Sequence, residues 1–333
     1  MEVSYDQLIS DLKQKKYQPV YFLCGEEPYY IDKISDFIEN NVLDEAEKSF
    51  NQSIIYGRDT DPINIINEAM RYPMMSEHLV VIVKEAQDIK KIDELHPYIE
   101  NPTPTTILVI CYKKKGVDKR TAFGKNIVKK CVYFESAKVY DNKMPQWIEQ
   151  YVKDKKYKID PKAALMLTEF LGNDLSKVSN EIDKLILNIS SGGEITPALI
   201  EKFIGISKDY NVFELTKALG LKDVLKANKI VNYFAANPKS NPFVLIISNL
   251  HGYFSKLIIT QAIKNQSENT IASELGVNPY FVKEFKAACA NYDYRKLVQI
   301  ISLLHEYDLK SKGVDSSQDH GELLKELVFK ILH

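Results

Sequence analysis

Short apolar runs alternate with helical patterns over the first 140 residues of the chain. Several runs are apolar without alternation, which is typical of strands that helices cover on both faces. The runs occupy residues 20–23, 52–56, 79–83, 106–111 and 131–134. The helical patterns between them occupy residues 28–42, 62–71, 91–99 and 121–129. This order predicts βαβ units and a parallel five-stranded α/β domain over residues 1–140.

From Asn142 onward the apolar positions follow the helix period, and we expect the rest of the chain to be helical. Asp160-Pro161 and Thr196-Pro197 mark two helix starts by an N-cap followed by proline. Helices at 145–153, 161–171, 175–188 and 197–204 would form a small bundle over residues 141–208. Helices at 212–219, 223–236, 242–264, 270–275, 279–290, 293–312 and 322–332 would form a larger one over residues 209–333. The predicted fold is α/β followed by all-α, in three domains.

The composition allows a sizeable core but no general attraction to nucleic acid. The chain has 333 residues, of which 45% are hydrophobic, and a net charge of −1. Any contact with DNA must therefore come from a local basic patch. The N-terminus lacks the pattern of a signal sequence, and no segment approaches the roughly 18 apolar residues of a membrane span. We expect a soluble, cytoplasmic protein with no membrane partner.

The cysteines and histidines show no spacing typical of catalysis or metal binding. Cys24, Cys111, Cys131 and Cys289 are far apart, without a Cys-x-x-Cys pair or a nearby histidine at ligand spacing. Buried, reduced cysteines are the simplest interpretation. None of the six histidines lies beside a nucleophile and an acid in the sequence. The sequence therefore predicts no cofactor, no metal and no catalytic site.

The first strand and the helix after it lie where a nucleotide-binding protein carries its phosphate loop. That loop needs glycine-rich backbone, a lysine and a serine or threonine hydroxyl. Here Glu26 and Glu27 occupy the turn, where a helix N-terminus stabilises carboxylates but the carboxylates repel phosphate. The third strand ends with Lys84 instead of the aspartate that helps to hold magnesium. We expect an ordinary strand-to-helix turn and no ATP, the alternative being a retained nucleotide contact.

Six segments in order along the chain together resemble one protein family. They are 21–30 (YFLCGEEPYY), 72–77 (YPMMSE), 172–185 (GNDLSKVSNEIDKL), 211–215 (NVFEL), 275–280 (LGVNPY) and 307–313 (YDLKSKG). No single segment is diagnostic, but their order and spacing resemble the delta subunits of the bacterial DNA polymerase III clamp loader. The resemblance implies an AAA+ type α/β domain, a small helical lid domain and a C-terminal helical collar domain.

The resemblance also implies a function and a set of partners. In that family neighbouring subunits bind ATP, while the delta subunit binds the ring-shaped sliding clamp (the beta subunit) and holds it open for loading on primed DNA. The implied partners are the clamp, the delta prime and tau/gamma subunits through the collar, and primer-template DNA in the complex. A polymerase activity would then belong to the holoenzyme and not to this chain.

The segment from Tyr72 to Met75 is the candidate clamp-binding site. It follows a predicted helix that Pro73 should stop, so that the next residues can project from the domain. The resemblance assigns an apolar pair here to a hydrophobic pocket on the clamp, and Met74 and Met75 match that pair by spacing. The family's bulkier leucine-phenylalanine type of pair is absent, which leaves a share of the role to Tyr72 or Pro73. The alternative is that both methionines pack under the third strand as core.

The most basic stretch of the chain follows the fourth predicted strand. Its candidate DNA-binding residues are Lys113, Lys114, Lys115, Lys119, Arg120 and Lys125, and Lys129 and Lys130 continue the run. Such a run can lie over the phosphate backbone of primed DNA. The alternative is a solvated loop and helix face.

Residues 270–290 have the spacing of a helix-turn-helix, with Gly276 at the turn. A recognition helix presents Arg, Asn or Gln to base edges, whereas Pro279, Tyr280 and Phe281 follow this turn and suit packing. We therefore expect a structural helix pair. The second interpretation of the whole chain is a DNA-binding, AAA+ related regulator or repair protein that uses this segment. A small-molecule enzyme lacks any acid, base, nucleophile or metal set.

Overall fold

The structure is a computed structural model that describes residues 3–207, 209–314 and 317–333, without the side chain of Asp141. It divides into two compact units, Met1–Val139 and Tyr140–His333. This boundary lies one residue from residue 140, where the α/β domain was predicted to end. The further division of the second unit at residue 208 stays a prediction.

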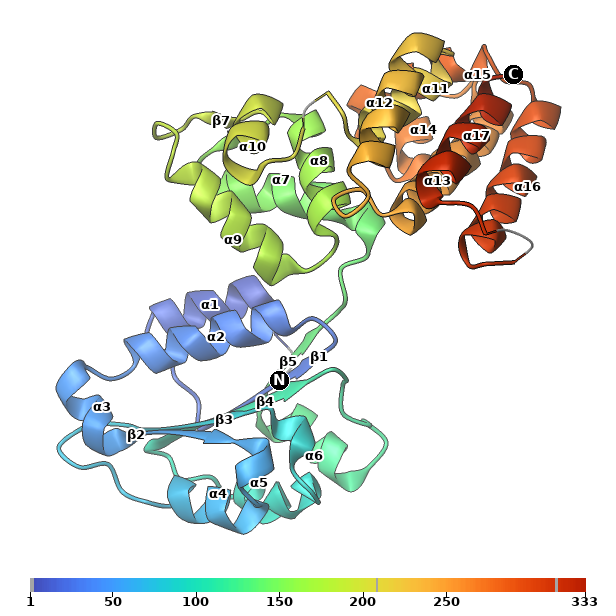
Figure 1. The fold of residues 1–333 in the computed structure, drawn as a ribbon. Helices are drawn as coiled ribbons and strands as arrows, with labels where there is room; N and C mark the ends of the chain where they lie inside the picture. Colours follow the sequence, from blue (N-terminus) through green and yellow to red (C-terminus); the bar gives the residue numbers. More distant parts are fainter. Residues whose placement is uncertain (1–2, 208, 315–316) are drawn as a thin grey trace. The chain divides into compact units, whose positions relative to one another are not determined.

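The first unit is built on a parallel sheet of five strands, as predicted (Figure 1). The strands are β1 (Val20–Gly25), β2 (Gln52–Tyr56), β3 (Leu79–Lys84), β4 (Thr106–Lys113) and β5 (Val132–Ser136). Their spatial order is β2-β3-β4-β1-β5. Because all strands run the same way, β1, β3, β4 and β5 end along one edge of the sheet, and the loops that lead into them lie along the other.

Helices cover both faces of this sheet (Figure 1). The helices are α1 (Tyr5–Lys13), α2 (Pro28–Asn41), α3 (Glu45–Asn51), α4 (Pro62–Ala69), α5 (His96–Glu100) and α6 (Ala122–Lys130). Along β3, Val80 and Ile82 belong to the core beneath α1 and α2, whereas Val81 belongs to the core beneath α4, α5 and α6. Both side-chain rows of the strand are buried, which explains its unbroken apolar sequence.

The sequence pattern missed two helices and predicted one helix where the structure has two shorter elements. The nine-residue helix α1 buries only Leu8 and Leu12. The seven-residue helix α3 is mainly polar and forms through a capping box between Asp44 and Glu47. Residues 91–99, predicted as one helix, form a 3₁₀ turn (Ile92–Leu95) followed by α5. Short elements of this kind carry too few apolar positions for a periodic signal.

The second unit begins with the four helices that were predicted for residues 141–208. They are α7 (Met144–Asp154), α8 (Pro161–Leu171), α9 (Leu175–Ile186) and α10 (Pro197–Ile204). The expectation that this part is entirely helical was wrong, because β6 (Lys158–Ile159) and β7 (Glu194–Ile195) form a small parallel pair. Strands of two residues have no alternation that a sequence pattern can reveal.

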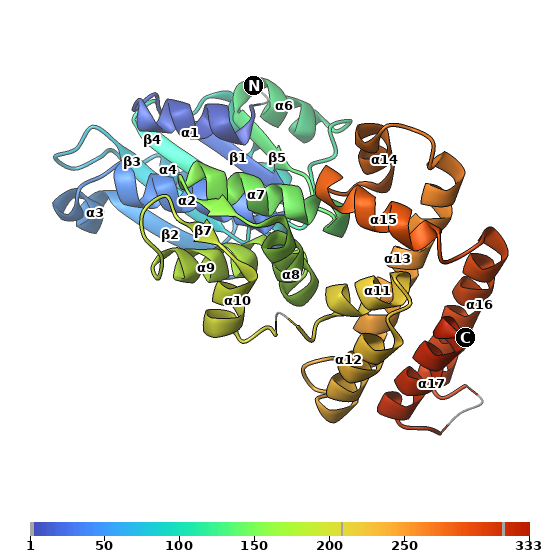
Figure 2. The same ribbon diagram turned by 90° about the horizontal axis from the view of Figure 1, so that it is seen from above.

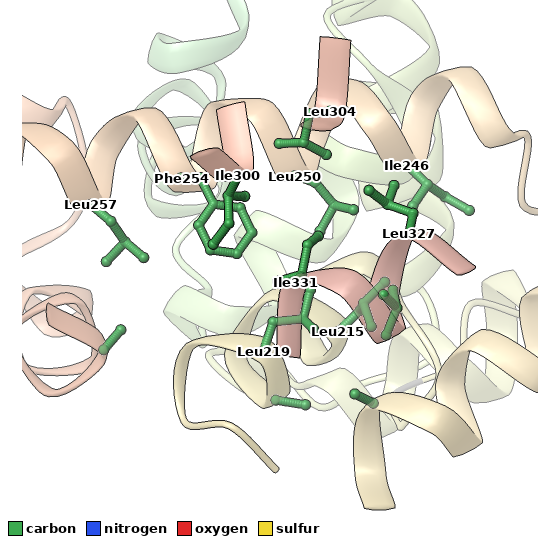
Figure 3. Packing of buried hydrophobic residues seen from close by; sticks show 14 of the residues in the cluster. Leu215, Leu219, Ile246, Leu250, Phe254, Leu257, Ile300, Leu304, Leu327 and Ile331 are labelled. Atoms are coloured by element: carbon green, nitrogen blue, oxygen red, sulfur yellow. The ribbon is translucent and has the colours of Figure 1, made fainter. Parts of the chain in front are cut away.

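Figure 2 shows the remaining helices, whose buried residues form the largest hydrophobic cluster given by the described part of the chain. They are α11 (Val212–Gly220), α12 (Val224–Ala236), α13 (Phe243–Ile263), α14 (Glu268–Leu275), α15 (Val282–Cys289), α16 (Tyr294–Ser311) and α17 (His320–Leu332). Figure 3 shows Leu250 and Phe254 of α13 packed among residues of α16 and α17. These helices lie where they were predicted, within about three residues at each end.

One helix corrects the expectation that no segment approaches a membrane span. By length and composition α13 could cross a bilayer, since it has 21 residues and an 18-residue window of mean hydropathy 1.4. Ile246, Leu250, Phe254 and Leu257 are buried among the neighbouring helices of the second unit. Of the apolar window, 39% is buried, and Val244, Leu245 and Ile259 of the same helix are exposed. A helix that packs one side into a protein core passes the same test of length and hydropathy.

Candidate functional site

The loop between α4 and β3 (residues 70–78) exposes apolar side chains at the edge of the sheet where the strands begin. Met75 is fully exposed, and Tyr72 and Met74 have exposed fractions of 81% and 57%. Pro73 is half-buried. The alternative in which Met74 and Met75 pack as core under β3 is therefore not what the structure contains.

The helix that leads into this loop ends earlier than predicted. Residues 62–71 were expected to be helical up to Pro73, but α4 ends at Ala69 and Met70 caps it. The carbonyl of Ala69 accepts hydrogen bonds from Thr106 Oγ1 at 2.8 Å and from Tyr98 Oη at 3.2 Å. Side chains from β4 and α5 thus satisfy the carbonyl group at the C-terminus of α4, and the loop begins at a fixed point.

Two further features of this loop were missed in the sequence. Met70 and Phe50 are also exposed, at 59% and 62%, and Arg71 Nη2 lies 3.5 Å from the carbonyl oxygen of Phe50. Phe50 of α3 and Met70 at the start of the loop therefore add exposed apolar side chains next to the predicted segment 72–75. Only the fold reveals this, because Phe50 is more than twenty residues away in the sequence.

The opposite edge of the sheet, where β1 ends, is closed by the chain itself. Glu27 caps α2, and its Oε1 accepts from the amide of Tyr29 at 3.1 Å, so a carboxylate takes a place that phosphate takes in nucleotide-binding proteins. The amide of Glu26 donates to the carbonyl of Ser136 at 3.0 Å. A Cβ atom on Gly25, which has a φ of +124°, would lie 2.1 Å from that same carbonyl oxygen. The turn is an ordinary tight turn, sealed against β5.

Charged side chains at the ends of β3 and β4 pair with one another. Lys113 Nζ lies 2.8 Å from Asp32 Oδ1 and 2.9 Å from Glu85 Oε1. Gln87 donates from Nε2 to Glu85 at 2.6 Å and accepts from the amide of Lys113 at 3.0 Å. We call Asp32, Glu85, Gln87 and Lys113 the edge cluster.

The pKa values of the edge cluster follow from these contacts. Burial by itself lowers the pKa of Lys113, but hydrogen bonds to Asp32 and Glu85 outweigh it and the pKa is raised. Burial by itself raises the pKa of Glu85, but hydrogen bonds from Lys113 and Gln87 outweigh it and the pKa is lowered. Lys113 and Glu85 are each held in the charged form by these hydrogen bonds.

Lys84, which stands in the place of a magnesium-binding aspartate, is also paired. Its Nζ lies 2.9 Å from Glu39 Oε2 on α2. A lysine and its carboxylate partner thus occupy the end of β3, where an acidic ligand would have to project toward a metal ion.

The predicted basic residues fall into two groups. Lys113 belongs to the edge cluster, and Lys119 Nζ lies 2.9 Å from Glu135 Oε2. Arg120 makes two bonds of 2.9 Å to the carboxylate of Asp118. The second group consists of the exposed lysines of this run that have no acidic partner among the described residues, namely Lys114, Lys115, Lys125, Lys129 and Lys130.

The helix-turn-helix-like segment is a structural helix pair. Gly276 ends α14 in the left-handed conformation, with a φ of +61°, as a turn at that position requires. After the turn, Phe281, Val282 and Phe285 are buried in the helical core. Of the three residues that were expected to suit packing, only Phe281 is buried, whereas Pro279 and Tyr280 are exposed, so for these two the expectation was wrong.

Among the described residues, no group of three or more His, Cys, Asp or Glu side chains could hold a metal ion. Cys24, Cys111 and Cys131 are buried, as expected from their apolar surroundings, and Cys289 is half-buried. Burial raises the pKa of Cys24 to about 11, so this thiol is unreactive at neutral pH.

Comparisons with known proteins agree with this arrangement. The family model described as DNA polymerase III, delta subunit, matches residues 21–137, and the model for the C-terminal domain of the delta subunit matches residues 209–330. The DNA polymerase III subunit delta of Bacillus subtilis is 27% identical over 330 residues, covering 95% of this chain and 93% of its own. The solved structure of the Bacillus subtilis DNA clamp loader delta protein shares the fold, with a TM-score of 0.55, 23% identity and 99% of each chain covered. The chain belongs to the delta subunit family of DNA polymerase III, whose members are components of the clamp loader.

Proposed function

We propose that this protein binds the sliding clamp, the beta subunit, through Tyr72, Pro73, Met74 and Met75 of the α4–β3 loop. The observation that carries the proposal is the exposure of two adjacent methionines on a loop whose ends are held by the sheet. Methionine is unbranched and polarizable, so it adapts to an irregular apolar pocket. A buried side chain of this size contributes about 1.5–3 kcal/mol to association.

Binding of this kind opens a ring only if the open ring is bound better than the closed ring. A binder shifts such an equilibrium by no more than its difference in affinity for the two states. The loop would therefore engage a clamp surface whose shape or accessibility changes when the ring opens. No chemical step by this chain is needed for that work.

The proposal includes clamp binding without ATP. It is supported by the sealed turn at Gly25 and by the ion pairs of Lys84 and Lys113, which occupy the region where an ATPase holds phosphate and magnesium. The neighbouring delta prime and tau/gamma subunits, joined through the C-terminal helices, would supply ATP hydrolysis. The loader would act in the cytoplasm and place the ring on primer-template DNA.

The test is isothermal titration of the purified clamp into the full-length protein without nucleotide. Binding should be measurable, and replacing Met74 and Met75 with alanine should weaken it about tenfold or more, as expected for the loss of interface hot spots. An unchanged affinity in this double variant would remove the loop from the clamp site. A separate titration with ATP and magnesium should give no heat of binding, and micromolar affinity would contradict the ATP-independent part.

A further inference from the structure

In the α4–β3 loop, the backbone of residues 72–77 is tied to the rest of its domain by one side chain. Asn51 Oδ1 accepts from the amide of Met74 at 2.6 Å, and Asn51 Nδ2 donates to the carbonyl of Met74 at 2.9 Å. Among the described residues, these are the only hydrogen bonds that join residues 72–77 to another element. The side chain belongs to the last residue of α3, 23 positions earlier in the chain.

A carboxamide suits this position because its donor and acceptor lie side by side, as do the N–H and C=O groups of one residue. The second proton of Asn51 Nδ2 reaches the carbonyl of Glu47 at 3.2 Å, so both protons and the oxygen have partners. If the carboxamide were rotated by 180°, its NH2 group would face the amide N–H of Met74, and its oxygen would face the carbonyl oxygens of Met74 and Glu47. Asn51 is only 1% exposed, so water cannot replace these bonds.

The hydrogen bonds to Asn51 lie next to an unusual backbone conformation at Met75. Met75 has a φ of +55°, in the left-handed region that residues other than glycine rarely adopt, and its side chain is fully exposed. Such a conformation persists only where the surrounding structure imposes it. The two bonds to Asn51 fix the peptide groups on both sides of Met74, immediately before that strained position.

We propose that Asn51 is a positioning residue that holds the α4–β3 loop in one backbone conformation and so presents Met74 and Met75 to the clamp. The inference rests on the proposed function of the loop. Asn51 itself makes no contact with the clamp, because it is buried. It acts by raising the fraction of free protein whose loop is ready to bind. The apparent dissociation constant equals the intrinsic constant divided by this fraction, so a larger fraction gives tighter binding.

The test compares Asn51→Leu with Asn41→Leu in the full-length protein. Asn41 is a matched control, since it too ends a helix and its Nδ2 donates to the carbonyl four residues earlier, that of Phe37, at 2.8 Å. It has no bond to a loop in the described residues. Asn51→Asp is the second variant, because it keeps the size and the acceptor for Met74 while it loses both donors.

The first measurement is amide hydrogen exchange without the clamp, read across residues 74–76. Each lost hydrogen bond shifts a conformational equilibrium by roughly two- to tenfold, so exchange should be about tenfold faster in Asn51→Leu. Exchange should be unchanged in Asn41→Leu and in β3 of both proteins. Unchanged exchange at residues 74–76 in both Asn51 variants overturns the inference whatever the clamp does.

The second measurement is clamp affinity, alone and with Met74→Ala and Met75→Ala. Asn51→Leu should weaken binding about tenfold in the wild-type loop, and should have no further effect once both methionines are alanine. An equal loss in both backgrounds would indicate general destabilisation and would overturn the positioning role. If the alanine pair weakens binding but Asn51→Leu does not, the inference fails alone. If neither changes the affinity, the proposed function fails with it.

Discussion

The two ends of the parallel strands in the first unit use their side chains in opposite ways. At the end where β1, β3 and β4 terminate, Lys113 is paired with Asp32 and Glu85, and Lys84 with Glu39. At the other end, Met74 and Met75 face solvent. The first edge is the usual ligand site of an open α/β sheet, and here its own residues fill it.

The two edges differ in the free-energy cost of binding a partner. A charged group that already has a partner must lose it before it can bind a phosphate or a metal ion, and that loss opposes binding. An exposed apolar side chain has no such partner to lose and gains free energy when a partner covers it. Under the proposed function, this domain therefore binds its partner at the edge opposite the one where nucleotide-binding α/β proteins hold their ligand.

The largest expected effect is at the exposed edge. Met75→Asp would place an unpaired charge in the apolar contact and should weaken clamp binding by at least about a hundredfold. The thermal unfolding temperature should be unchanged, because the side chain contacts solvent. Leu187→Asp is the matched control, since Leu187 is 85% exposed in the second unit and should leave clamp affinity unaltered. A comparable loss in the control would show that any exposed apolar residue has this effect.

At the paired edge, the substitution Lys113→Met should lower stability without affecting clamp binding. It leaves Asp32 and Glu85 close together without their cation and should lower the free energy of unfolding by about 1–2 kcal/mol, with clamp affinity nearly unchanged. Lys125→Met, at an exposed lysine of the same segment, should cost less than about 0.5 kcal/mol. Unfolding of the first unit is best followed by hydrogen exchange in β3 and β4, because the single tryptophan, Trp147, reports on the second unit. Equal stability of the two variants would contradict the role of the edge cluster.

The edge cluster also predicts a pH dependence. Because the pKa of Glu85 in the folded protein is below its usual value of 4.5, its contribution to stability is present above about pH 4.5. That contribution is lost as the pH falls further and the folded protein takes up the proton. Wild type should therefore exceed Glu85→Gln in unfolding free energy at pH 7, and the difference should shrink below pH 4.5. A difference that grows on acidification would reverse the assignment.

The smallest predicted effect concerns DNA. In the assembled loader, replacing Lys114 and Lys115 with alanine should reduce the slope of log affinity against log salt by up to about two, one for each phosphate that a lysine no longer neutralises. Replacing Lys119 and Arg120 should change it less, because their charges are already partly neutralised by Glu135 and Asp118. Identical slopes for wild type and both variants would favour a solvated basic face.

Local signals in the sequence predicted most elements of the fold. The helices that begin at Pro161 and Pro197 were placed correctly at both ends, because an N-cap side chain and a following proline act within one turn. The pair β6–β7 was missed, since it depends on pairing between residues about 36 positions apart. The end of α4 was misplaced for the same reason, because Thr106 and Tyr98 help to decide it.

For the candidate site, the sequence by itself determined the absence of a phosphate loop and the presence of two adjacent methionines after a helix. Both are statements about residue type at a position, which the chain carries before it folds. Only the tertiary structure decided that Met74 and Met75 are exposed, that Asn51 holds their backbone, and that Lys113 is already paired. Exposure and pairing depend on which distant residues the fold brings together, and no local pattern encodes that choice.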